Sequence, residues 1–464
     1  MSDKEIIAQQ VQQITKLEVS LQAALRRIAE LEARLGQNSS NSSLPPSRDG
    51  LSKRPAFPRA KGKARGGQKG HRGNTLQMVA QPDEVVIHSV MDVCSCGSDL
   101  SVVPGQISGK RQVFDLPPQR LVVTEHQSER KVCPACQSVH QGAFPEEVPA
   151  PVQYGGRVKA LVSLLSVGHH MPVAGIKSLF ADLFGYAINE ATIQGANALC
   201  YEHLAEEEAW IRSQVSQADL AHFDESGLRS EGKLHWLHVA CTSLWTYFYV
   251  HARRGTEALQ DQASVWKDFT GRAVHDCWAS YFSDEGRAHG ICGAHLLREL
   301  TALIEQGSLW AQQMHTLLMQ LYLLSEKGQS CLEAQALELA REAYAEILIQ
   351  ADKQEPPPQA SSRGRPKQSK GRNLMHRLAN HQEAVLAFAQ YENVPFTNNL
   401  AERDIRPWKT KLKVSGCFRT RTGANHYARI RGFISTARKQ SKPVFSELCR
   451  VLKGESFLRD LMTT

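Results

Sequence analysis

Four short runs of β-branched and aromatic residues most constrain how this chain of 464 residues folds. The first three follow one another at hairpin spacing, and the fourth comes after a stretch compatible with helix. The four runs cover residues 219–229, 233–242, 244–255 and 271–282. From residue 292 onward, apolar residues recur at helical spacing instead. The pattern predicts a multidomain α+β protein whose main sheet precedes a long helical region.

Three acidic residues fall at the ends of these predicted elements. Asp224 and Asp276 end the first and fourth apolar runs, and Glu402 opens a late helix. If the first and fourth strands are neighbours, the two aspartates meet at one edge of the sheet. Three carboxylates that lie close together at one site repel one another unless divalent metal ions bind them. Two Mg²⁺ or Mn²⁺ ions about 3.5–4 Å apart would do so.

Each of these acids also has an ordinary structural explanation. Aspartate is common in the turn after a strand, which is where Asp224 and Asp276 fall. The spacing of Asn399 and Glu402 fits a capping box, and Glu402 and Arg406 fit an i,i+4 ion pair. Other acids compete for the same role, namely Asp219, Glu225, Asp284 and Asp404. The residues alone therefore leave the assignment of the acids open.

Basic residues are concentrated in three blocks, although the net charge is only +8. The first lies between Asp49 and Asp83, where there is no acid, and the second covers 363–377. The third covers 403–421. Candidate phosphate-binding residues in the first and third blocks are Lys61, Lys63, Arg65, Lys409, Lys411, Lys413, Arg419 and Arg421. Three such blocks favour nucleic acid as the partner, although any single block could be a solvated linker.

The first 36 residues repeat in sevens. One seam position holds Ile7, Ile14, Leu21, Ile28 and Leu35, and the other holds Gln10, Leu17, Ala24 and Leu31. Gly36 then ends the pattern. We expect a coiled-coil zipper over 1–36 that joins copies of the chain, with a single amphipathic helix as the alternative. A Ser-, Asn- and Pro-rich stretch and the first basic block make 37–84 a flexible linker.

Two cysteine pairs lie in a segment of short, β-branched runs over 85–148. The pairs are Cys94 with Cys96 and Cys133 with Cys136. Four thiolates in two knuckles predict one structural zinc ion in a small β domain, although His88, Asp92 or His140 could replace a sulfur. Unmetallated thiols are the alternative. The odd count of eleven cysteines argues against a disulfide framework.

The remaining helical pattern covers residues 150–215. A helix, a turn centred on Gly185 and a second helix from Asn189 resemble a helix-turn-helix, with Thr192, Gln194 and Asn197 facing outward. Two ordinary packed helices fit the sequence equally well. No secretory signal and no apolar run of about 20 residues is visible. We therefore expect a cytoplasmic protein that does not contact membranes.

Six motifs then identify a family resemblance that runs nearly end to end. They are "NSSNSSLPPSRD", "GGQKGHRG", "HFDESGLRSEGKLHWLHVA", "HDCWASYF", "CGAHLLREL" and "TNNLAERDIRPWKTKLKVSGCFRT". The chain resembles the DDE transposases of bacterial insertion-sequence family sixty-six. The resemblance implies a catalytic triad of Asp224, Asp276 and Glu402. One departure is Thr397, where the family more often has an aspartate.

The resemblance also implies an RNase H-like core in two parts. These are 216–300 and 385–440, separated by a helical insertion with a basic loop over 301–384 and followed by a helical tail over 441–464. The residues expected to support the site are Cys292, His295, Arg298, Asn398 and Asn399. A second zinc ion, bound by Cys292 and His295, is a less favoured interpretation.

The implied function is transposition. The protein would bind the inverted-repeat ends of an insertion sequence and cut and join DNA with two Mg²⁺ or Mn²⁺ ions, near the nucleoid. Small companion proteins of the same element are further expected partners. A DNA-binding regulator descended from a transposase and a metal-dependent nuclease without strand transfer are the alternatives. The three intact acidic motifs argue against the regulator.

Overall fold

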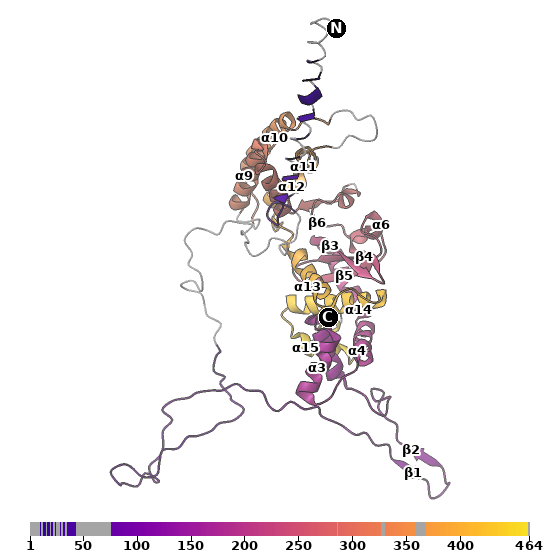
Figure 1. Ribbon diagram of the computed structural model, residues 1–464. Helices are drawn as coiled ribbons and strands as arrows, with labels where there is room; N and C mark the ends of the chain where they lie inside the picture. Colours follow the sequence, from indigo (N-terminus) through magenta and orange to yellow (C-terminus); the bar gives the residue numbers. More distant parts are fainter. Residues whose placement is uncertain are drawn as a thin grey trace.

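The structure is a computed structural model (Figure 1). It describes residues 36–42, 76–284, 286–325, 330–358 and 368–462, with individual positions between 10 and 35. Lys61, Lys63 and Arg65 lie outside the described residues, as does most of the predicted basic loop near 363. Among the described helices, none has both the length and the apolarity needed to cross a membrane.

A five-stranded mixed sheet lies at the centre of the molecule, in the order β5-β4-β3-β6-β7 (Figure 1). The strands are β3 (Leu220–Ser230), β4 (Lys233–Cys241), β5 (Thr246–His251), β6 (Arg272–His275) and β7 (His289–Ile291). The first three pair antiparallel, while β6 and β7 continue the sheet in parallel with β3. All four predicted strands are present, but the fourth covers only Arg272–His275, and the end of its run forms a 3-10 helix over Ala279–Phe282. The fifth, β7, is too short to show an alternating pattern.

The two faces of β3 are packed against different layers. His222 faces α13 (Asn399–Ser415), because its ring bonds to the Asn398 side chain just before that helix. Phe223 points the other way, with its ring edge-on to Trp266 at 5.0 Å between centroids. Since side chains alternate along a strand, Asp224 shares the face of His222. The sheet thus directs Asp224 toward α13.

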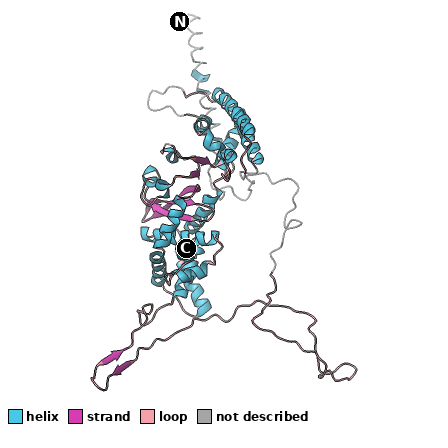
Figure 2. Cartoon of the chain, turned by 180° about the vertical axis from the view of Figure 1, so that it is seen from behind, coloured by secondary structure: helices cyan, strands magenta, loops and turns pink. Residues whose placement is uncertain are grey.

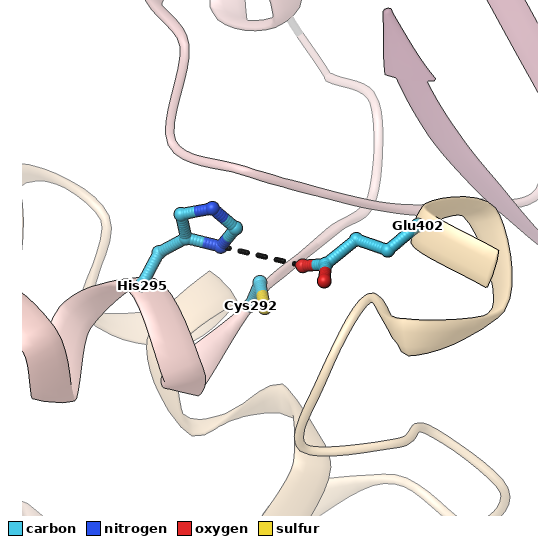
Figure 3. Close-up of side chains that lie close together, drawn as sticks. All are labelled: Cys292, His295 and Glu402. Atoms are coloured by element: carbon cyan, nitrogen blue, oxygen red, sulfur yellow. Dashed lines mark ion pairs between the residues drawn. The ribbon is translucent and has the colours of Figure 1, made fainter. Parts of the chain in front are cut away.

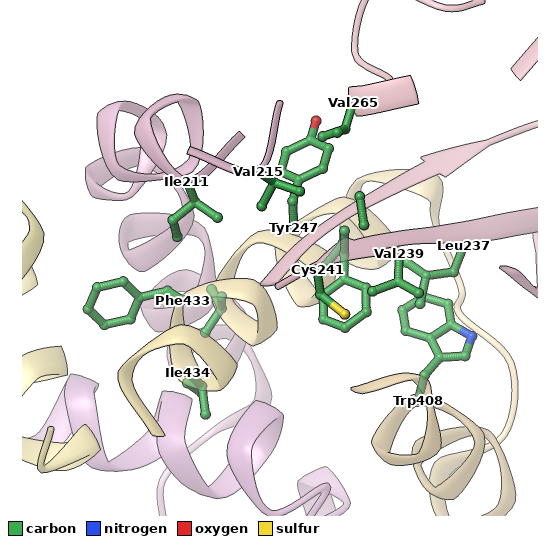
Figure 4. Packing of buried hydrophobic residues seen from close by; sticks show 14 of the residues in the cluster. Ile211, Val215, Leu237, Val239, Cys241, Tyr247, Val265, Trp408, Phe433 and Ile434 are labelled. Atoms are coloured by element: carbon green, nitrogen blue, oxygen red, sulfur yellow. The ribbon is translucent and has the colours of Figure 1, made fainter. Parts of the chain in front are cut away.

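Helices cover the antiparallel half of the sheet and form the main core. Figure 4 shows Val239 and Cys241 of β4 and Tyr247 of β5 beside Phe433 and Ile434 of α14 (Arg421–Lys439). All five side chains are buried. Burial of this kind contributes about 25 cal/mol per Å² of apolar surface, which makes α14 the main support of this part of the sheet.

A second hydrophobic core belongs to the helices that separate β7 from α13. They are α8 (Gly293–Ile304), α9 (Leu309–Leu324), α10 (Ala334–Gln354), α11 (Lys370–Asn380) and α12 (Gln382–Gln390). Trp310, Met314 and Tyr344 are fully buried in it. The chain returns to the sheet at Phe396, whose carbonyl accepts a hydrogen bond from the Gly293 N–H at 2.8 Å. A Cβ at Gly293 would lie 2.2 Å from the Phe396 ring, so only glycine fits there.

The predicted helical segment before the sheet is present. It contains α2 (Gly156–Ser163), the π-helix η2 (Leu164–Gly168), α3 (Val173–Phe184), α4 (Glu190–His203) and α5 (Ala205–Ser216). Helix α3 ends at Gly185 in the left-handed conformation, and Asn189 caps α4 by accepting the Thr192 N–H. The expectation that Asn197 faces outward is wrong, because it is 7% exposed and bonds to Ser166.

Residues 76–153 are mostly extended and lie away from the helical body (Figure 2). The only strands described there are β1 (Arg130–Val132) and β2 (Val139–Gln141), which form a hairpin. The β-branched run expected to form a strand at 84–90 forms none, and the run at 119–132 forms one only at its end, as β1. Val85, Ile87 and Val123 are 69–82% exposed, so these β-branched residues have no layer to pack against. The small β domain is therefore reduced to one hairpin.

Candidate active site

Strand register brings Asp224 and Asp276 to the same level of the sheet. In the parallel pair of β3 and β6, Leu220 is opposite Arg272 and His222 is opposite Val274. Carried two residues further, the same register sets Asp224 opposite Asp276. Opposed residues of parallel strands point to the same face. The predicted meeting of the first and fourth strands is confirmed.

Both aspartates are partly buried acids without a cation. Burial, followed by the charges of Glu225 and Asp276, raises the pKa of Asp224 to about 8. Burial and then Glu225 raise the pKa of Asp276 to about 6. Each carboxylate accepts a backbone hydrogen bond, from Glu225 at 2.9 Å and Trp278 at 3.2 Å. Within the described residues neither forms an ion pair, so no ion-pair partner offsets the cost of ionising them.

The rival acids are occupied by structural partners or exposed. Glu225 binds Arg254 through Nε at 2.8 Å and the Tyr281 hydroxyl at 2.7 Å. Asp404 binds Lys439 at 2.7 Å. Asp284 accepts from the Trp266 and Gln260 side chains and pairs with Arg287, and Asp219 is exposed. These contacts leave Asp224 and Asp276 as the acids of the sheet that lack a partner of opposite charge.

Glu402 lies in the first turn of α13 and makes neither of its expected structural contacts. The N-cap is Asn398, not Asn399, and no side chain caps the helix, so the capping box is absent. No ion pair with Arg406 occurs among the described residues. Glu402 instead lies beside His295, with 3.9 Å between Oε1 and Nδ1. Both structural explanations of this glutamate are therefore wrong.

Asn398 fastens the start of α13 to the strand that carries Asp224. Its Nδ2 donates to the Phe223 carbonyl at 2.7 Å, and its Oδ1 accepts from His222 Nδ1 at 2.9 Å. Its backbone N–H donates to the Cys292 thiol at 3.2 Å. The Asn398 side chain is almost completely buried. One asparagine thus joins β3, the start of α8 and the start of α13.

Glu402 shares its surroundings with two residues of the loop and first turn of α8. Figure 3 shows Cys292, His295 and Glu402 close together, and their ligand atoms all lie within 4.8 Å of one another. Asp224 and Asp276 do not belong to such a tight group in the described part of the chain. The structure therefore brings the two aspartates together and holds Glu402 beside Cys292 and His295. The sequence singled out those two residues only through the family resemblance.

Lys409 and Arg298 act electrostatically on this arrangement. Burial, followed by Arg298 and Lys409, lowers the pKa of His295 to about 4, so its ring is neutral at pH 7. Lys409 also lowers the pKa of Asp224, against the larger effect of burial. Lys409 is exposed and one α-helical turn past Ile405 on α13. The charge of Lys409 therefore lowers the pKa of both Asp224 and His295.

The other predicted phosphate-binding residues differ in how free they are. Lys413 and Arg421 are exposed, and Arg419 pairs with Glu190 of α4 at 3.1 Å while remaining 87% exposed. The ammonium group of Lys411 is occupied by contacts within the protein. Its Nζ lies 3.6 Å from the centroid of the Phe418 ring and donates to a backbone carbonyl, and burial lowers its pKa to about 8. Lys411 is therefore less open to a ligand than its neighbours.

The two cysteine pairs occupy turns of the same design, although they form no single cluster in the described structure. Cys94 N–H bonds to the Ser98 carbonyl and Cys133 N–H to that of Ser138, both at 2.9 Å. The residue after the second cysteine has positive φ in each turn, 91° at Gly97 and 59° at Gln137. Hydrogen bonds with the serine, then with the partner cysteine, lower the pKa of Cys96 and Cys136 to about 7. Both turns favour the thiolate that zinc requires.

Family models match the chain in three places. The model described as Transposase IS66 family matches residues 151–426, which is more than half of the chain. A zinc-finger binding domain of transposase IS66 matches 92–137, which includes all four cysteines of the two turns. A family of unknown function matches 2–77. No curated protein matches the chain.

The raised pKa of Asp224 predicts a pH-dependent stability. Unfolded, this carboxyl ionises near 3.8, and folded near 8. Between these values the folded protein holds a proton that the unfolded chain has released, so stability falls as pH rises. Asp224→Asn should raise the free energy of unfolding at pH 8, by up to about 5 kcal/mol, and flatten the slope. Urea denaturation across this pH window, without divalent cations, measures both.

The matched control is Asp219→Asn, at an exposed acid just before the same strand. It should leave the pH dependence as in the unaltered protein. An unchanged slope in Asp224→Asn would show that Asp224 does not carry this proton.

Proposed function

The chain belongs to the IS66 family of transposases, and we propose that it binds the ends of an insertion sequence and catalyses metal-dependent DNA cleavage and strand transfer. The observation that carries this proposal is the pair formed by Asp224 and Asp276. These are two facing acids with raised pKa and no cationic partner in the described part of the chain. Such a pair is unfavourable for the free protein and suits a site that receives divalent cations.

Strand order and direction support an RNase H-like core. The sheet has three antiparallel strands followed, on the other side of β3, by two parallel ones. Asp224 lies on the central strand and Asp276 directly after its parallel neighbour. The helices from α8 to α12 would then be an insertion in this core, between the second and third acids of the triad.

The donor set fits hard divalent cations. Asp224, Asp276 and Glu402 offer only carboxylate oxygens, which Mg²⁺ and Mn²⁺ prefer. Two such ions, when bound, would activate the attacking oxygen and stabilise charge on the phosphodiester. Protonated at neutral pH, Asp224 would release its proton as the cation binds. Glu402 completes the triad when its side chain turns from His295 toward the aspartates.

Exposed cations beside the site would hold the DNA backbone. Lys409, Lys413 and Arg421 lie along α13 and at the start of α14, on the segment that carries Glu402. Arg419 connects this segment to the first turn of α4 through Glu190. This contact supports a continuous DNA surface that runs from the site to the α3–α4 pair, which we propose reads the element ends as a helix-turn-helix.

Replacing a triad residue should abolish catalysis and preserve DNA binding. Asp224→Asn, Asp276→Asn and Glu402→Gln should each lower Mg²⁺-dependent strand transfer by on the order of 10³-fold or more, because each removes an anionic metal ligand. Binding to DNA with the element's terminal repeats should stay within about threefold. Labelled-DNA joining assays and gel shifts measure the two quantities.

Glu392→Gln, at an exposed acid outside the site, is the matched control and should leave both quantities unchanged. Normal joining by any of the three triad variants would contradict the assignment. Cleavage without joining in the unaltered protein would favour a nuclease over a transposase.

The zinc-finger match supports a structural zinc ion, and we propose that Cys94, Cys96, Cys133 and Cys136 are its ligands. Combined Cys133→Ser and Cys136→Ser replacement should lower the zinc content by about one ion per chain, since two thiolates alone hold zinc weakly. Elemental analysis of the purified protein measures this loss. The control pair, Cys331→Ser and Cys417→Ser, replaces exposed cysteines elsewhere. Equal zinc in both variants would rule out this ligand set.

The heptad seam supports assembly of two or more copies. Ile14, Leu17, Leu21 and Ile28 are helical and 51–64% exposed, so the described part of the chain does not cover these apolar side chains. A coiled coil would bury them, and joining two DNA ends needs a paired assembly.

Charge in the seam should therefore dissociate the assembly. Leu17→Asp with Leu21→Asp should shift the mass measured by light scattering toward that of a single chain. Lys16→Glu, on the opposite side of the repeat, should not change it. A mass equal to one chain in the unaltered protein would contradict the zipper.

A further inference from the structure

The cluster of Cys292, His295 and Glu402 has the chemistry of a second kind of metal site. It offers one sulfur, one imidazole nitrogen and one carboxylate oxygen, all within 4.8 Å of one another. Three mixed ligands with an open fourth position are typical of zinc and its neighbours among the transition metals. Magnesium takes oxygen ligands and would not choose this set. The cluster therefore differs in metal preference from the aspartate pair.

Local structure holds the three ligands in place before any ion arrives. Cys292 is the N-cap of α8 and His295 lies in its first turn, while Glu402 lies in the first turn of α13. The backbone N–H of Asn398 ties the Cys292 sulfur to the start of α13. The ligands thus come from two helix starts that are fastened to each other.

One ligand atom is left without a partner. His295 Nδ1 is buried and makes no hydrogen bond, although Glu402 Oε1 lies 3.9 Å away. Buried polar atoms are normally satisfied, so an orphaned nitrogen aimed at a carboxylate indicates a missing component. In a tetrahedral zinc site, nitrogen and oxygen ligands lie about 3.3 Å apart. To reach that geometry the nitrogen–oxygen distance must shorten by about 0.6 Å and the distances to the sulfur by at most about 1.2 Å.

We propose that Cys292, His295 and Glu402 bind a zinc-class divalent cation, and that this ion inhibits the enzyme by holding Glu402 away from Asp224 and Asp276. The binding part stands on the cluster alone. The inhibitory part rests on the proposed function, in which Glu402 joins the two aspartates to hold the catalytic cations.

Competition for one carboxylate is the physical basis of the inhibition. Glu402 is the member that the cluster and the catalytic triad share. An ion held by the Cys292 thiolate and His295 keeps this side chain in its present position. Magnesium cannot displace that ion at the sulfur and nitrogen, so excess magnesium should relieve the inhibition poorly. A chelator selective for zinc should restore activity.

Cobalt binding tests the site directly. Co²⁺ bound to a thiolate absorbs strongly in the near ultraviolet. The full-length protein, purified with its own zinc, is titrated with Co²⁺, and this absorption is measured. The unaltered chain should show about one more thiolate-bound cobalt per chain than Cys292→Ser. Cys331→Ser, at an exposed cysteine outside the cluster, should match the unaltered chain. Equal absorption in the unaltered chain and Cys292→Ser would overturn the site.

His295→Gln provides a second variant in case Cys292→Ser does not fold, which circular dichroism would reveal. This change keeps the thiol and removes the ring nitrogen. It should weaken cobalt binding at the cluster by at least about tenfold, because a ligand is lost. Unaltered cobalt affinity in His295→Gln would also overturn the site.

Strand transfer with Mg²⁺, measured with and without one added equivalent of Zn²⁺, tests the inhibition. The rate of each protein with added Zn²⁺ is compared with its own rate without added Zn²⁺. A lower starting activity of a variant therefore does not affect the comparison. The unaltered chain should lose at least about tenfold, and Cys292→Ser less than about twofold. Equal losses would overturn the inhibitory role. Cobalt binding without any magnesium-dependent joining would overturn that role and the proposed function while supporting the site.

Discussion

The buried amide of Asn398 is the contact on which the rest of the candidate site depends. The sheet delivers Asp224 and Asp276, but Glu402 follows only after the helices from α8 to α12. Nothing in the backbone of the sheet selects where the chain returns. Asn398 does so, because its side chain bonds to Phe223 and His222 and its N–H to Cys292. A buried amide with these partners satisfied fixes one position and direction for α13.

The charge arrangement follows from the same geometry. Strand register forces Asp224 and Asp276 together on a partly buried face, and the adjacent Glu225 adds a third negative charge. The protein neutralises Glu225 with Arg254 and Asp404 with Lys439, yet provides no such partner for the aspartate pair among the described residues. An uncompensated pair lowers stability, and the well-packed core against α14 offsets it. Buried acids without an ion-pair partner, beside acids that have one, are characteristic of sites that receive a cation.

The local sequence pattern was sufficient to predict a helix or strand wherever the element packs on a hydrophobic core. The runs that contain Asp224 and Asp276 became β3 and β6, because most of their residues are buried between two layers, although β3 continues past Asp224 to Ser230 instead of ending there. The same β-branched signal failed at 84–90, where no layer covers the residues. Burial of Asn197 and the packing of Lys411 on Phe418 escaped prediction too, since both depend on elements distant in sequence. Periodicity reports which face is apolar, not what covers it.

The surroundings of Glu402 could be predicted least from the sequence, and the proposed inhibition depends on them. Sequence placed this residue in a helix start, and the structure agrees, but its neighbours come from α8, more than a hundred residues earlier. Because Cys292 and His295 offer sulfur and nitrogen while Asp224 and Asp276 offer oxygen, Glu402 stands between ligand sets with opposite metal preferences. A carboxylate can serve either set, and in the proposal above the position of the Glu402 side chain decides which. The hardness of the available cation, rather than a movement of domains, would then determine whether the three acids assemble.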